Sequence, residues 1–164
     1  MNNNKGFSLI EVLVVIAIMS VMTGLAALSI SLVHNANVND ACNKIESALS
    51  SARVTSMAKG QEAGKITFIM DGGSLYYTIG DDPTRTRVTT GSITVTTNNV
   101  PKCPSASGAA WADGVSYTYK FNSAGMLVDS DSSPCCIILA HKARHSAVWV
   151  YRETGKIETG MFYL

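Results

Sequence analysis

A long stretch without charged residues, close to the amino terminus, constrains this chain more than any other feature. The 28 residues from Val12 to Asn39 include no Asp, Glu, Lys or Arg, and residues 12–33 are apolar or weakly polar throughout. A helix of about 20 such residues crosses the ~30 Å hydrocarbon core of a bilayer, so the stretch predicts a membrane-spanning helix. A cleaved secretory signal fits poorly, because the apolar run exceeds the usual ~7 to 15 residues and Glu11 lies at its leading edge.

The overall composition fits one domain of nearly balanced charge. The chain has 164 residues, with 13 basic against 12 acidic side chains and a formal net charge of +1. This balance excludes bulk attraction to nucleic acid or to an anionic membrane surface, so either would need a local patch. Only 15% of the residues are charged, compared with roughly 25% in average soluble domains. The deficit is concentrated in the charge-free stretch.

The residues at the start of this stretch form a specific motif. Residues 5–13 read Lys-Gly-Phe-Ser-Leu-Ile-Glu-Val-Leu, which resembles the class III signal of type IV prepilins and of type II secretion pseudopilins. The resemblance implies that residues 1–6 are a leader, that prepilin peptidase cuts between Gly6 and Phe7, and that the new amino terminus at Phe7 is methylated. It also implies that residues 7–33 form a transmembrane and assembly helix.

Glu11 is the residue of this motif that physical chemistry singles out. A carboxylate inside an apolar span costs about 2.5 to 3.5 kcal/mol at the centre and less near the edge, which makes Glu11 a functional candidate. After cleavage, the amine of Phe7 would lie four residues before Glu11, on the same helix face. In the pilin family this glutamate pairs with the amine of a neighbouring subunit, so the resemblance implies that Glu11 is the assembly carboxylate. The alternative is that Glu11 only extends to the membrane interface.

The helix is expected to continue beyond the apolar stretch. Apolar residues recur at the i, i+3, i+4, i+7 spacing of an amphipathic helix, at Val38, Ala41, Cys42, Ile45, Ala48, Leu49 and Ala52. The pair Lys59–Gly60 predicts its end, because glycine is a common residue just past a helix.

After Gly60 the pattern changes to short runs rich in β-branched and aromatic residues, separated by Gly, Asp, Asn and Pro. These runs predict strands at 65–70, 75–79, 93–97, 115–121, 136–140, 147–151 and 156–160. Asp71-Gly72-Gly73 and Glu153-Thr154-Gly155 predict tight turns, and residues 81–114 predict a loop region with one or two weak strands. The expected fold class is α+β: a long amino-terminal helix packed on an antiparallel sheet in a globular domain of residues 34–164.

Three later segments resemble particular groups within the prepilin-like family. Residues 45–53, 119–125 and 148–157 are similar to the H-type minor pseudopilins of type II secretion and to the FimT minor pilins. The residues of these segments also have a purely structural interpretation, in which Phe121 is a buried strand residue and Gly125 and Gly155 are turn glycines.

The four cysteines predict disulfides, because the bulk of the chain would face the exterior. Four cysteines allow three pairings. The neighbours Cys135 and Cys136 are poorly placed to bridge each other, so we expect one to pair with Cys103 and the other with Cys42. A zinc site is not favoured, since no Cys-x-x-Cys pair occurs.

Oxygen-rich loops are the only other candidates for metal binding. The stretches Asp81–Asp82 and Asp129–Ser133 offer carboxylates and hydroxyls, and some pseudopilins bind calcium in loops, but neither stretch has complete EF-hand spacing. We therefore expect no metal and no cofactor.

One local group of basic residues is apparent, near the carboxyl end: Lys142, Arg144, Arg152 and Lys156, with His141 and His145 beside them. FimT-like proteins are linked to DNA uptake, and in them a basic region of this kind would contact phosphates. Here Glu158 stands where such proteins tend to have a second base. DNA binding is therefore kept as an alternative to a solvated loop or a subunit contact.

The sequence has no enzyme motif: no Gly-x-Ser-x-Gly, no phosphate-binding glycine loop and no His-Glu-x-x-His. The expected function is that of a minor pilin or pseudopilin, anchored in the bacterial inner membrane with its globular domain in the periplasm. Assembly would place it in a type IV pilus or a type II secretion pseudopilus. Its expected partners are other pilin subunits, prepilin peptidase and the inner-membrane assembly platform. A major pilin, a DNA receptor and an anchored domain that never polymerises are the alternatives.

Overall fold

The computed structural model describes residues 8–89, 93–98, 108–128, 134–142 and 144–163, without the side chains of 26–35, 162 and 163. Several predicted features lie outside these residues: the cleavage site at Gly6 and Phe7, Cys103, and the acidic stretch 129–133. The chain divides into two compact units, residues 1–34 and residues 35–164.

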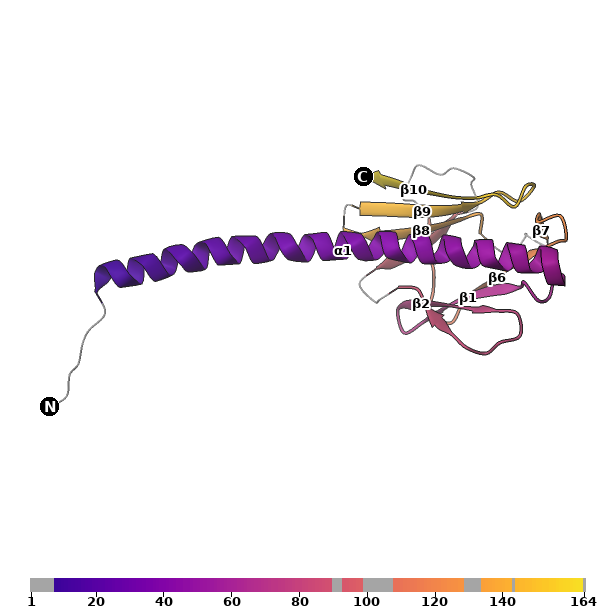
Figure 1. The fold of residues 1–164 in the computed structure, drawn as a ribbon, viewed down its shortest axis with the longest axis horizontal. Coiled ribbons are helices and arrows are strands. Elements are labelled where there is room, and N and C mark those ends of the chain that lie inside the picture. The colour runs from indigo at the N-terminus through magenta and orange to yellow at the C-terminus, as the bar shows by residue number, and fades with distance from the viewer. Residues whose placement is uncertain (1–7, 90–92, 99–107, 129–133, 143, 164) are drawn as a thin grey trace. The chain divides into compact units, whose positions relative to one another are not determined.

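The helix α1 runs from Leu9 to Lys59, a length of 51 residues (Figure 1). Ser8 precedes it, and the Ser8 carbonyl accepts hydrogen bonds from the backbone N–H groups of Glu11 at 3.0 Å and Val12 at 3.2 Å. Ser8 and Glu11 have the Ser-x-x-Glu spacing of a capping box, which favours a helix start here. The helix ends where the sequence predicts, since Gly60 follows with φ of 99° and donates its N–H to the Ser56 carbonyl.

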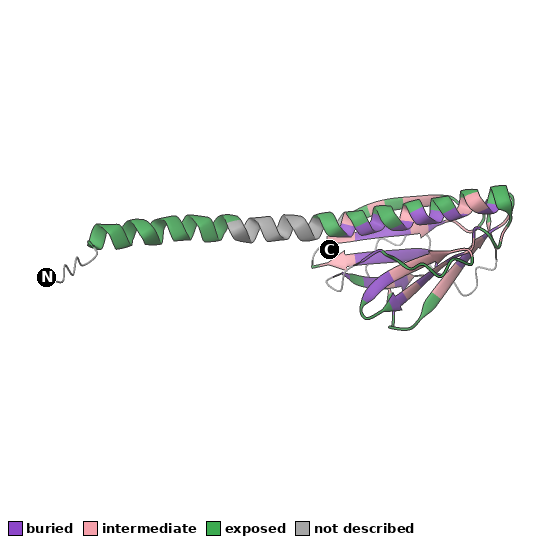
Figure 2. Cartoon of the chain, turned by 60° about the horizontal axis from the view of Figure 1, so that its bottom comes forward, coloured by how far each residue is buried: buried purple, intermediate pink, exposed green. Residues whose placement is uncertain are grey.

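In the first unit, the described part of α1 exposes apolar side chains on every face (Figure 2). Its two hydroxyl residues satisfy themselves within the helix, since Ser20 Oγ donates to the Ile16 carbonyl and Thr23 Oγ1 to the Met19 carbonyl. Neither hydroxyl therefore needs water or a second chain for its hydrogen bond.

In the second unit, α1 buries a single stripe against the sheets (Figure 2). Every residue that the 3.6-residue period places on the apolar face is less than 5% exposed, which confirms the predicted amphipathic half; these are Val38, Ala41, Cys42, Ile45, Ala48, Leu49 and Ala52. Residues between them, such as Asn43 and Ser50, remain exposed.

The first sheet has five antiparallel strands in the order β3-β2-β1-β6-β7. They are β1 (Ile66–Asp71), β2 (Ser74–Ile79), β3 (Thr86–Arg87), β6 (Ser116–Phe121) and β7 (Leu127–Val128). The predicted turn between β1 and β2 is confirmed: Asp71 pairs with Ser74, and Gly72 and Gly73 both have positive φ, 55° and 70°. Two residues with positive φ give the tight hairpin that glycine favours.

The second sheet also has five antiparallel strands, in the order β10-β9-β8-β4-β5. They are β4 (Thr94–Asn98), β5 (Ala109–Ala110), β8 (Cys136–His141), β9 (Arg144–Val150) and β10 (Ile157–Tyr163). The last three strands follow one another as hairpins, and the predicted turn before β10 is formed, with Gly155 at φ of 62°.

The α+β fold class is therefore confirmed, and all seven strands predicted from the sequence are found. The sequence did not reveal that the strands divide between two sheets. The alternation of apolar and polar residues along a strand indicates which face is buried, but not which strand lies beside it. Both sheets and the helix stripe share one core, in which Leu49 of α1 belongs to the same buried cluster as Phe68 of β1 and Val148 of β9.

Candidate functional site

The first candidate site is the amino-terminal segment of α1. Glu11 lies in the first turn of the helix, where the partial positive charge of the helix end favours a carboxylate. Its side chain is exposed, as are those of Val12 and Val15 beside it. This carboxylate is the only charged group among the helical residues from Leu9 to Leu25.

The apolar side chains around Glu11 are exposed in the described part of the unit. Twelve large apolar side chains between Leu9 and Leu25 are from 47% to 85% exposed. A water-facing patch of this extent is unusual for a soluble monomer and indicates contact with another apolar surface. Burying these side chains would contribute on the order of 10 to 20 kcal/mol.

The cysteines correct one prediction. Cys42 and Cys135 are buried thiols outside any disulfide, so the predicted bridge from Cys42 to the neighbouring pair is not found in the described residues. The physical reason is that the helix residue Cys42 and the strand residue Cys136 face different buried clusters. Cys42 projects from α1 and donates to the Ala147 carbonyl of β9 at 3.6 Å, whereas Cys136 belongs to a separate buried cluster with Ile138.

Burial also makes Cys42 unreactive. Desolvation, with a smaller contribution from the negative charge of Glu46, raises the pKa of the Cys42 thiol to about 12. The thiol is therefore protonated at physiological pH and does not serve as a nucleophile.

The basic residues do not form the single patch that the sequence predicted. Lys142 lies in the turn between β8 and β9, and Arg144 begins β9. Arg152 and Lys156 lie beyond the other end of this seven-residue strand, roughly 20 Å away. Both arginines also form hydrogen bonds within the domain. Arg144 Nη2 donates to Asn39 Oδ1 at 3.2 Å, and Arg152 Nε donates to Cys135 Sγ at 3.1 Å.

A contact that sequence reasoning missed joins α1 to two turns. Arg53 donates from Nε to the Gly125 carbonyl at 2.9 Å and from Nη2 to the Thr154 carbonyl at 3.0 Å. Gly125 and Gly155 have φ of 76° and 62°, which supports their structural interpretation as turn glycines. Phe121 is likewise fully buried, as that interpretation predicts.

Potential metal ligands are dispersed. In the described ranges, no three His, Cys, Asp or Glu side chains come together in a group able to hold a metal ion. Asp82 instead accepts the backbone N–H of Thr84 at 2.8 Å, and hydrogen bonding from the Thr84 side chain, followed by this backbone contact, lowers the pKa of the Asp82 carboxyl group.

Comparison with known families identifies the motif at the amino terminus of the chain. Residues 1–27 match the profile of the prokaryotic N-terminal methylation motif. The chain therefore carries the amino-terminal signal of a type IV pilin-like precursor, a class of membrane-anchored subunits that prepilin peptidase processes and that assemble with one another. The α+β fold of the remainder is consistent with this class.

No curated protein sequence and no solved structure matches the chain significantly. Among the helical residues that the structure describes, no segment meets the length and hydropathy expected of a membrane-crossing helix.

Proposed function

We propose that this chain is a minor pilin or pseudopilin: a structural subunit that enters a type IV pilus or a type II secretion pseudopilus through its amino-terminal helix. In this proposal, prepilin peptidase cuts between Gly6 and Phe7, Phe7 is methylated, and the precursor is held in the inner membrane with residues 35–164 in the periplasm. The chain has a structural role and no enzymatic one.

The observation that carries the proposal is a methylation motif that includes the start of an apolar helix. The motif covers residues 1–27, and the described helix residues within it expose their apolar side chains on all faces. Lipid before assembly and neighbouring helices after it would both cover such a surface. Internal hydrogen bonding of Ser20 and Thr23 supports transfer between these two environments, because neither hydroxyl must give up a bond to water.

Glu11 has a specific part in the proposal. A lone carboxylate buried among packed apolar helices is costly in free energy unless an opposite charge neutralises it. The free amine created at Phe7 supplies that charge. Pairing between the amine of one subunit and Glu11 of its neighbour would therefore set the register of packed helices.

The experiment follows maturation and incorporation separately in cells that make the full-length chain. Gly6→Ala should block cleavage and leave a slower-migrating precursor band on an immunoblot. Glu11→Ala should be cleaved normally but be absent from sheared or purified filaments. Asp40→Ala is the matched control, because Asp40 is an exposed carboxylate on the same helix that forms an ion pair with Lys44 at 2.8 Å.

The two halves of the proposal fail in different ways. Normal maturation of the Gly6 variant would refute the processing site. Incorporation of the Glu11 variant at the level of the Asp40 control would refute the assembly role of Glu11. If the wild-type chain is not cleaved and never leaves the membrane, the whole proposal is refuted. The protein would then be an anchored domain that does not polymerise.

A further inference from the structure

The outer strand of the second sheet has a free edge. β10 is the first strand in the order β10-β9-β8-β4-β5, and in the described residues no strand pairs with its outer side. It is seven residues long, whereas the other edge strands, β3, β5 and β7, have two residues each. A long unpaired edge presents a row of backbone N–H and C=O groups to any extended chain that comes alongside.

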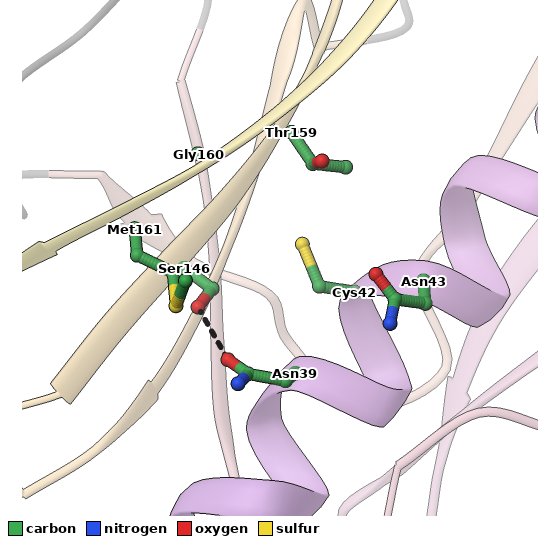
Figure 3. A pocket seen from close by; sticks show the side chains of 7 residues that line it. All are labelled: Asn39, Cys42, Asn43, Ser146, Thr159, Gly160 and Met161. Atoms are coloured by element: carbon green, nitrogen blue, oxygen red, sulfur yellow. Dashed lines mark hydrogen bonds between the residues drawn. The ribbon is translucent and has the colours of Figure 1, made fainter.

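A cavity of about 210 Å³ lies between this strand and α1. Figure 3 shows Asn39, Cys42 and Asn43 on the helix side and Ser146, Thr159, Gly160 and Met161 on the strand side. The lining combines polar and apolar groups and is uncharged, since burial keeps the Cys42 thiol protonated. Ser146 Oγ and Asn39 Oδ1, at 3.4 Å, link the two walls.

Opposite charges mark the two ends of this cavity. Arg144 Nη2 contacts Met161 Sδ at 3.0 Å as well as Asn39, and Arg144 Nε is buried without an acceptor in the described residues. At the other end, Glu46 Oε2 accepts a hydrogen bond from Thr159 Oγ1 at 3.4 Å. Among the described residues, neither Arg144 nor Glu46 forms a salt bridge, so each charge can accept an external partner.

The spacing of these charges selects the kind of ligand. Met161 and Thr159 are two residues apart on β10, which corresponds to about 7 Å, and Asn39 and Glu46 are seven residues apart on α1, about 10 Å. Side chains two residues apart on one face of an extended peptide are also about 7 Å apart, which matches the spacing of Thr159 and Met161. The cavity is also smaller than the ~300 to 1,000 Å³ typical of small-molecule sites, so it fits part of a polypeptide better than a whole metabolite.

We propose that the cleft between α1 and β10 binds an extended segment of a different protein, which adds to the free edge of β10. The segment carries an acidic residue that pairs with Arg144 and, two positions along, a basic residue that pairs with Glu46. Backbone pairing with β10 provides the affinity, and the two charges fix direction and register. The cleft is separate from the amino-terminal segment on which the proposed function depends.

The test uses the full-length chain in the cells that produce it, with a photo-cross-linking amino acid at Met161. The same probe at Val54 is the matched control, because Val54 lies outside the cleft on α1 and is 64% exposed, compared with 61% for Met161. Mass spectrometry of the adducts identifies the cross-linked peptide. The expected adduct forms at Met161 and not at Val54, and its peptide contains an acidic and a basic residue two positions apart.

Charge reversal then tests the pairing itself. Arg144→Glu and Glu46→Lys should each reduce the Met161 adduct roughly tenfold or more, because each places like charges together. Reversing the facing charge in the identified partner should restore it. Alkylation of Cys42 reports on folding, since the thiol stays protected while α1 packs on β9.

Four results would overturn the proposal: no adduct at Met161, equal adducts at Met161 and Val54, an adduct formed only with a copy of this chain, or adducts that neither reversal changes. None of them bears on cleavage at Gly6 or on incorporation of the Glu11 variants, so the two proposals fail independently.

Discussion

The contact between Arg53 and two glycine turns gives the sharpest quantitative prediction. Arg53 Nε donates to the Gly125 carbonyl at 2.9 Å, and Gly155, next to the second acceptor Thr154, packs directly against that same carbonyl. A Cβ atom added at Gly155 would fall on the Gly125 carbonyl oxygen. Gly155→Ala must therefore move one of the two turns.

The cost of Gly155→Ala has two parts. Its φ of 62° is left-handed, which costs an alanine about 1 to 2 kcal/mol. Displacing the Gly125 carbonyl also breaks its hydrogen bond from the Arg53 guanidinium, worth about 1.5 to 3 kcal/mol for a charged donor. The expected loss in free energy of unfolding is therefore about 3 to 5 kcal/mol.

Gly72→Ala separates the conformational cost from the cost of displacing the Gly125 carbonyl. Gly72 also has a left-handed φ, 55°, but a Cβ atom there would meet no atom within 4 Å. Its substitution should cost only the conformational part, about 1 to 2 kcal/mol.

The assay is urea unfolding of the full-length chain in detergent, followed by the fluorescence of the buried Trp111. The unfolding free energies of the two variants should differ by about 1.5 to 3 kcal/mol, and Arg53→Met, which removes both of its hydrogen bonds, should lose at least that much. Equal destabilisation by Gly155→Ala and Gly72→Ala would refute the argument, because it would mean that the crowding at Gly125 costs nothing.

Two further predictions concern buried ionisable groups. Burial raises the pKa of Tyr119 well above its usual 10.0, so the folded state resists deprotonation; stability should be constant below pH 10 and fall above it, and Tyr119→Phe should reduce this fall in urea midpoints measured from pH 8 to 11. Because the pKa of Cys42 is about 12, its peptide should remain unmodified when the folded chain is treated with iodoacetamide at pH 8 and become modified in urea; labelling without denaturant would contradict its burial.

Local patterns predicted the elements of this fold accurately. The helix end at Lys59, its buried stripe and the glycine turns at Gly72 and Gly155 all follow from interactions within a few residues. The amino-terminal motif is equally local, and its 27-residue profile match agrees with the family resemblance of that segment. The two-residue strands β3 and β5 lie where one or two weak strands were predicted without positions, and β7 was not predicted, because a pair of residues shows no periodicity.

Closeness in the sequence did not predict closeness in space where a whole strand separates two residues. Lys142 and Lys156 are close in the sequence, but strand β9 carries the chain from one end of the sheet to the other between them. One of Cys135 and Cys136 was expected to meet Cys42, yet Cys42 and Cys136 lie in different buried clusters.

The sequence by itself determined the apolar helix, the position of its one carboxylate, the amphipathic stripe and the turns, because each depends on short-range geometry. Only the tertiary structure decided that the strands form two sheets, that Arg53 joins two distant turns, and that Arg144 and Glu46 mark the ends of one cleft. Those arrangements depend on which strands pair. Strand pairing is decided by the packing of the whole domain and leaves no local trace in the residues that later meet.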